Sequence, residues 1–143
     1  MNSKGIYKLF VYGSLRSGFR NPVYHYLTKY FNLMGEAVVK GILYDMGDYP
    51  VAIPTADEKF ISGELYSINN PSEFSWAIGQ LDDYEGIDAE AGEKPSYKRE
   101  EVLVYQKGQP VEAWIYWYNG DVTGKPEIES GDLLQYLQQK NKP

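Results

Sequence analysis

Runs of apolar and β-forming residues, separated by polar turns, recur along much of the chain and predict strands. Residues 8–12 (KLFVY) are rich in β-forming residues and predict a strand that ends before a glycine. Residues 33–44 continue in the same way but are interrupted by Gly35 and Gly41, which predicts bent or bulged strands. Residues 60–68 alternate around a glycine and predict a further strand.

Two later runs, residues 100–106 and 111–118, are separated by Lys107-Gly108-Gln109-Pro110, whose turn chemistry predicts a hairpin. The second run is apolar or aromatic at nearly every position, so we expect both faces of that strand to be covered. One face would carry Val111, Ala113, Ile115 and Trp117, and the other Trp114, Tyr116 and Tyr118.

The signals for helices are fewer than those for strands. Asn21-Pro22 combines a cap with a proline at the first helical position and predicts a short helix to Tyr30. Residues 70–73 (NPSE) open a second helix expected to end at about Asp82, and a last short helix is expected at residues 131–139. Because strands outnumber helices without regular alternation, we expect the α+β class, with a mixed, mostly antiparallel, β-barrel-like sheet and a few flanking helices.

Length and composition narrow the class of protein. The chain has 143 residues without a linker or repeat, which favours a single domain over residues 1–143. It has no cysteine, which excludes thiolate nucleophiles and favours a cytoplasmic location.

The net charge is −6 with scattered Lys and Arg, so nucleic acid is not an expected partner. No apolar run has the length of a membrane span, so no membrane is expected either. The composition permits a monomer or a dimer.

His25 and Ser14 are the first candidates for chemistry. His25 is the only histidine in the sequence, and one histidine cannot form a metal cluster. Ser14 lies in Gly13-Ser14-Leu15, which lacks the G-x-S-x-G pattern of hydrolase nucleophiles, and nothing in the sequence pairs it with His25. A packed or solvent-facing histidine is therefore the favoured interpretation.

The turn Tyr12-Gly13-Ser14-Leu15 follows a predicted strand, and its glycine would let a ligand approach backbone N–H groups closely. The spacing of a phosphate-binding loop is absent. From spacing alone, the segment can be an ordinary tight turn or a site for a carboxylate or a developing oxyanion.

Asp82, Asp83 and Glu85 place three acids within four residues at a helix end, where the helix dipole disfavours negative charge. An exposed acidic helix end is the simplest interpretation. A general base at Glu85 is the alternative, and the residues by themselves leave both open.

Six short motifs follow one another in a specific order and spacing. They are V-Y-G-S-L-R at 11–16, G-I-L-Y at 41–44, G-E-L-Y at 63–66, L-D-D-Y-E-G at 81–86, Y-K-R at 97–99 and A-W-I-Y at 113–116. Together they resemble the γ-glutamylcyclotransferase-like family, also described through AIG2-like proteins. The resemblance extends over most of the chain, roughly from Lys8 to the last helix.

The resemblance implies a compact α+β fold around a β-barrel-like sheet, with a pocket between the turn and the acid. It implies a reaction in which the α-amine of a γ-glutamyl group attacks its own γ-carbonyl. A γ-glutamylamine or a related small γ-glutamyl compound would then yield 5-oxoproline and a free amine. The implied site residues are Glu85 as general acid/base, Tyr12, Gly13, Ser14 and Leu15 as the substrate-binding turn, Tyr97 as a pocket tyrosine, and Tyr116 as a weaker candidate for the same pocket.

This chemistry requires no metal or cofactor. The attack is intramolecular and the nucleophile belongs to the substrate, so positioning, a proton acceptor and an oxyanion site are sufficient. Two other functions stay open: a non-catalytic small-molecule-binding protein of the same fold, and a hydrolase or acyltransferase that uses Ser14. The acidic segment at residues 88–94 can be a lid or a solvated loop, and no pattern in the sequence identifies the leaving amine.

Overall fold

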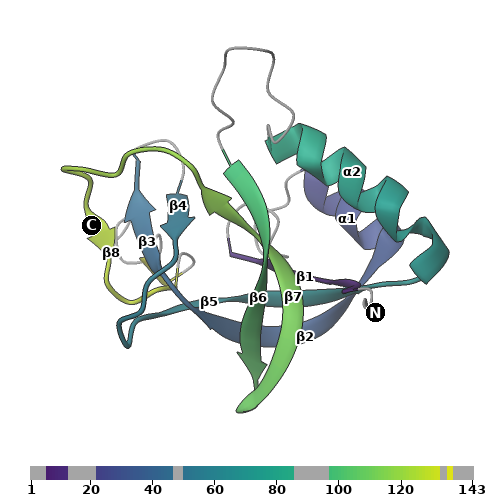
Figure 1. Cartoon of the computed structure of the whole chain (residues 1–143), viewed down its shortest axis with the longest axis horizontal. Coiled ribbons are helices and arrows are strands. Elements are labelled where there is room, and N and C mark those ends of the chain that lie inside the picture. Colours follow the sequence, from purple (N-terminus) through teal and green to yellow (C-terminus); the bar gives the residue numbers. More distant parts are fainter. Residues whose placement is uncertain (1–5, 13–21, 47–49, 86–96, 133–134, 137–143) are drawn as a thin grey trace.

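A closed barrel of five strands forms the centre of the structure (Figure 1). The computed structural model describes residues 6–12, 22–46, 50–85, 97–132 and 135–136, without the side chains of residues 22–24 and 83–85. Neighbouring strands follow the order β1-β5-β2-β6-β7, and β7 closes the barrel by running parallel to β1, whereas the other pairs are antiparallel. The strands are β1 (Lys8–Val11), β2 (Phe31–Lys40), β5 (Phe60–Ile68), β6 (Tyr97–Gln106) and β7 (Gln109–Tyr118).

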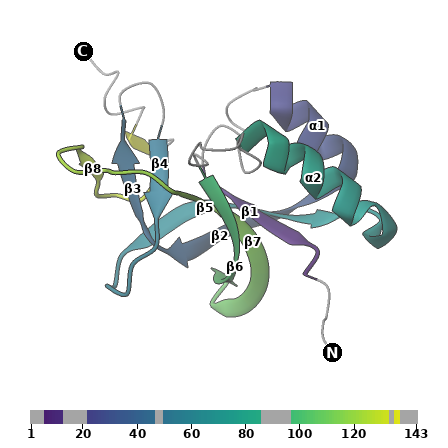
Figure 2. The same cartoon turned by 45° about the horizontal axis from the view of Figure 1, so that its top comes forward.

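A smaller sheet and the helices flank the barrel at opposite ends in Figures 1 and 2. The smaller sheet has the order β4-β3-β8 and consists of β3 (Ile42–Asp45), β4 (Pro50–Ile53) and β8 (Glu127–Ile128). The helices are α1 (Pro22–Tyr30), the 3₁₀ helix η1 (Pro71–Glu73) and α2 (Phe74–Glu85). No helix among the described residues is long and apolar enough to cross a membrane.

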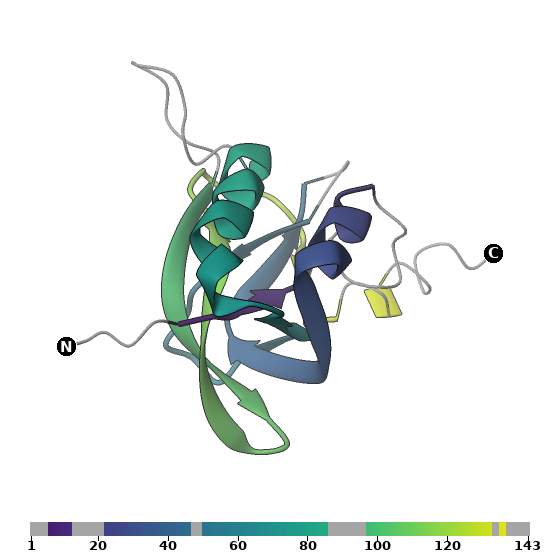
Figure 3. The same cartoon turned by 90° about the vertical axis from the view of Figure 1, so that its right-hand side faces the viewer.

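The helices α1 and α2 lie next to each other on the barrel, as Figure 3 shows. The Tyr26 hydroxyl of α1 donates a hydrogen bond to the Ala77 carbonyl oxygen of α2, at 3.3 Å. Burial, with a smaller contribution from nearby Tyr30, raises the pKa of Tyr26 to about 12. The shift favours the protonated hydroxyl, which is the form that donates this hydrogen bond.

The expected class, α+β with a mostly antiparallel barrel-like sheet, is confirmed. The glycine-interrupted segment forms β2 and β3, with a register shift between Leu33 and Gly35 and a break at Gly41. The hydrophobic pattern does not predict β4 and β8: β4 begins at a proline, and β8, with 2 residues, is too short to show a period.

Two predicted elements have other ends in the structure, and a third lies partly outside the described residues. The α2 helix continues to Glu85 rather than ending at about Asp82, because contacts of its last turn with the barrel offset the unfavourable dipole. The hairpin turn is shorter than predicted, with β6 and β7 joined by Lys107-Gly108. In the last predicted helix, the described residues include one helical hydrogen bond, from Tyr136 N to Asp132 O at 2.9 Å.

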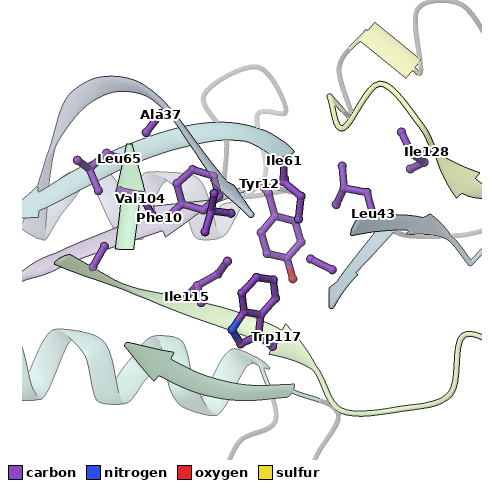
Figure 4. Packing of buried hydrophobic residues seen from close by; sticks show 13 residues of the cluster. Phe10, Tyr12, Ala37, Leu43, Ile61, Leu65, Val104, Ile115, Trp117 and Ile128 are labelled. Atoms are coloured by element: carbon purple, nitrogen blue, oxygen red, sulfur yellow. The ribbon is translucent and has the colours of Figure 1, made fainter. Parts of the chain in front are cut away.

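Hydrophobic side chains form two clusters, one inside the barrel and one between the barrel and the helices. Alternate residues of β7 contribute to both, which confirms the prediction that both of its faces are covered. The inner cluster includes Phe10, Tyr12, Ile61, Leu65, Ile115 and Trp117 (Figure 4). The outer cluster includes Leu9, Val11, Leu27, Tyr66, Phe74, Ile78, Leu81 and Tyr116.

Gly63 allows β5 to lie close to β1, and we expect Gly63→Ala to lower the free energy of unfolding by about 2 kcal/mol. A Cβ at this position would overlap the carbonyl oxygen of Val11 and would lie 2.6 Å from Cζ of Phe10. Rotation of a side chain cannot relieve a clash with the backbone, so the strands must separate. Urea denaturation of the variant measures the loss.

Gly79 on α2 provides the matched control, since a Cβ there meets no atom within 4 Å. Alanine favours the helix and restricts the unfolded chain, so Gly79→Ala should raise the free energy of unfolding by about 0.5–1 kcal/mol. If Gly63→Ala were as stable as the wild type, the close approach of β5 to β1 would be wrong.

Candidate active site

The candidate site begins where β1 ends, at Val11, with Tyr12 immediately after it. The Tyr12 side chain is buried in the inner cluster, and Figure 4 shows its ring among those of the barrel interior. Its hydroxyl donates a hydrogen bond of 2.6 Å to the carbonyl oxygen of Tyr116 on β7. Tyr12 is therefore anchored in the barrel just beyond the end of β1, while Gly13, Ser14 and Leu15 lie outside the described residues.

The second part of the site is the end of α2. Glu85, the expected acid, is the last residue of this helix, and its side chain is not among those described. Asp82 precedes it by three residues, close to one helical turn, and is only 8% exposed. A carboxylate as buried as this requires charged or hydrogen-bonding partners.

Asp82 has such partners on two strands of the barrel. Arg99 on β6 donates from Nε to Oδ1 at 2.7 Å and from Nη2 to Oδ2 at 2.9 Å, a bidentate pair. The Tyr116 hydroxyl donates to Oδ1 at 2.8 Å. The guanidinium of Arg99 also lies 4.5 Å from the ring centre of Trp114, which favours the cation electrostatically. The last turn of α2 is thereby attached to both β6 and β7.

Tyr97, the expected pocket tyrosine, is the first residue of β6 and is half-buried against the outer cluster. It pairs with Tyr118 at the end of β7, and the two rings meet edge to face at 5.7 Å between centroids. Two residues further along, Arg99 pairs with Tyr116. Tyr97 thus lies at the same end of the barrel as Tyr12 and the last turn of α2.

A second buried carboxylate lies at this level of the barrel, on β5. Glu64 is 8% exposed and pairs across the strands with Val11, the last residue of β1. The buried hydroxyl of Tyr66 donates to its Oε1 at 3.1 Å. Glu64 is the only charged residue of β5, which was the available sequence signal. Its burial depends on the helices that cover this face of the strand.

The sequence analysis also missed the roles of Asp82, Arg99 and Tyr116. All three occur in the quoted motifs, but their mutual contacts join residues that are 17 and 34 positions apart. Tyr116, considered a pocket tyrosine, is only 4% exposed and connects the strand end to the helix end instead. His25 is exposed on α1, which agrees with the solvent-facing one of the two expected positions, packed or solvent-facing.

The chain is similar to a known family over most of its length. Residues 9–135 match the family described as gamma-glutamyl cyclotransferase, AIG2-like. The gamma-glutamylcyclotransferase family protein YtfP of Escherichia coli (strain K12) is 34% identical over 128 residues, covering 89% of this chain and 96% of that protein.

Solved structures share the fold. The solution structure of ytfP from Escherichia coli has a TM-score of 0.60 at 30% identity, covering 90% of this chain and 97% of the other. The crystal structure of YkqA from Bacillus subtilis has a TM-score of 0.69 at 27% identity and covers 95% of this chain, which spans 43% of YkqA. The crystal structure of an AIG2-like protein from Mus musculus has a TM-score of 0.65 at 20% identity, and the match covers 88% of each chain. Since the family match extends over most of its length, the chain belongs to the γ-glutamyl cyclotransferase, AIG2-like family.

Proposed function

We propose that this protein is a γ-glutamyl cyclotransferase that releases 5-oxoproline and a free amine from a γ-glutamylamine or a related small γ-glutamyl compound. The observation that carries the proposal is the double contact of Tyr116. Its carbonyl accepts from Tyr12, where the Y-G-S-L turn begins, and its hydroxyl donates to Asp82, three residues before Glu85. Two motifs that are far apart in the sequence thereby meet at one end of the barrel, as the proposed site requires.

The reaction starts with the substrate α-ammonium, which must lose a proton before it can attack. In the proposal, the Glu85 carboxylate accepts this proton. The freed amine nitrogen forms a bond to the γ-carbonyl carbon, and backbone N–H groups of residues 13–15 stabilise the negative charge on the carbonyl oxygen. Collapse of this intermediate breaks the bond between the γ-carbon and the leaving nitrogen. Glu85 returns the proton to the departing amine, and the ring nitrogen loses its second proton to the released amine, which leaves as an ammonium ion.

No metal or cofactor enters this scheme, because the substrate supplies both nucleophile and electrophile. Because the attack is intramolecular without the protein, the contribution of the protein is to hold the substrate in the conformation in which the amine faces the carbonyl. The protein then needs three things: a rigid frame for the turn, a carboxylate at the correct distance from it, and exclusion of water.

The test is release of 5-oxoproline from a panel of γ-glutamyl amino acids, γ-glutamylamines and γ-glutamyl-ε-lysine. We expect product from at least one of these compounds, in equimolar amount with the free amine, and the preferred compound defines the class of leaving amine. Free glutamate in place of 5-oxoproline would indicate hydrolysis instead, and a covalent adduct on Ser14 would support the serine-dependent alternative. Tight binding of a panel member without any product would indicate a binding protein.

A further inference from the structure

We propose that Tyr116 is a positioning residue, which sets the placement of the last turn of α2, and with it Glu85, relative to Tyr12. This inference rests on the proposed function, because it assigns a role to Tyr116 in that reaction. It differs from the pocket role that the family motifs imply for this tyrosine, since a side chain that is 4% exposed has little surface to offer a substrate.

Tyr116 makes one hydrogen bond towards each half of the candidate site. The main-chain oxygen accepts from the Tyr12 hydroxyl at 2.6 Å, and the side-chain hydroxyl donates to Asp82 Oδ1 at 2.8 Å. The two bonds use different parts of the residue, so a substitution can remove the second and keep the first. Tyr116 itself pairs with Arg99 of β6, on a strand that has β6 on one side and β1 on the other.

The bond to Asp82 acts on the last turn of α2. In a helix, residues three apart lie on nearly the same face with a rise of about 4.5 Å between them, so a shift or rotation at Asp82 moves Glu85 with it. Arg99 holds the same carboxylate through both oxygens, but its guanidinium is on a long side chain. The shorter and stiffer tyrosine, with two rotatable side-chain bonds, defines the position more narrowly.

A small displacement of a catalytic group has a large effect on the rate. A misplacement of about 1 Å can reduce the rate by about a hundredfold, because the reacting atoms leave the attack geometry. Loss of the Tyr116 hydroxyl should therefore lower kcat more than it alters substrate binding, since the turn remains anchored through Tyr12.

The test is Tyr116→Phe, which removes one oxygen atom and keeps the ring, the main-chain carbonyl and the Arg99–Asp82 pair. With the preferred substrate, we expect kcat to fall about tenfold while KM changes by less than about twofold. In amide hydrogen exchange, residues 82–85 should exchange about tenfold faster than in the wild type, and residues 75–78 at an unchanged rate.

Tyr26→Phe is the matched control, because it also removes a tyrosine hydroxyl that donates to α2. That bond reaches Ala77, nearer the start of the helix. We expect kcat to stay near the wild-type value in this variant. An equal loss of kcat in both variants would show that general loosening of α2, rather than the placement of its last turn, limits the rate.

The outcomes separate this inference from the proposed function. Unchanged exchange at residues 82–85 in Tyr116→Phe overturns the inference, and so does faster exchange with unaltered kcat. If the wild type forms no 5-oxoproline from any γ-glutamyl compound, the proposed function fails. The exchange measurement then still decides whether Tyr116 holds the helix end.

Discussion

Replacing Glu85 by Gln is expected to lower the rate of 5-oxoproline release by about 10²–10⁴-fold. The amide has nearly the same shape as the carboxylate but cannot accept the proton of the substrate ammonium. The attacking amine then stays protonated, and the departing amine lacks a proton donor. Single-turnover measurements of 5-oxoproline with the preferred panel compound give the rate, and circular dichroism verifies the fold.

Glu73→Gln is the matched control for this prediction. Glu73 is exposed in η1, which precedes the first turn of α2, at the opposite end of the helix from Glu85. The same exchange of carboxylate for amide there should leave the rate unchanged. A Glu85→Gln enzyme with full activity would exclude Glu85 as the base, and a loss in both variants would point to a general effect of charge on the protein.

The largest loss of stability is expected from Arg99→Met, by about 3 kcal/mol. Methionine keeps most of the volume of the arginine stem but leaves the Asp82 carboxylate without its cation, with the Tyr116 hydroxyl as its remaining described donor. The side chains of Arg99 and Asp82 are only 22% and 12% exposed, so water compensates poorly. Urea denaturation at neutral pH measures the change.

An exposed ion pair on the same strand serves as the control. Lys98 Nζ lies 3.4 Å from Glu100 Oε2, and the two side chains are 48% and 45% exposed. We expect Glu100→Gln to change the free energy of unfolding by no more than about 0.5 kcal/mol, because solvent screens this pair. Similar small effects of Glu100→Gln and Arg99→Met would contradict the anchoring role of the Arg99–Asp82 pair.

The types of residue along the chain were sufficient to predict most of the barrel. Residues 60–68 alternate around a glycine, residues 8–12 and 111–118 are runs of β-forming residues, and each segment forms a strand of the barrel. The two-sided burial of β7 followed from its apolar residues alone. The short strands β4 and β8 could not be predicted, because their pairing with β3 rather than their own composition makes them strands.

In the candidate site, too, some assignments come from the sequence and others from the structure. Its members were identified from motifs, and the roles of Glu85, Gly13, Ser14 and Leu15 remain predictions, since their side chains or whole residues lie outside the description. The role of Tyr12 as an anchor, with its ring in the core and its hydroxyl on Tyr116, is a finding of the structure.

By itself, the sequence determined the class of fold, the positions of the main strands along the chain and the residue types available for chemistry. The reason is that β-forming runs and turn residues act over short distances along the chain. The tertiary structure alone decided that Asp82, Arg99 and Tyr116 form one buried network. It also decided that Glu64 is buried beside the end of β1. Such contacts depend on strand register and on where α2 lies against the barrel, and the period of a single segment carries no information about either.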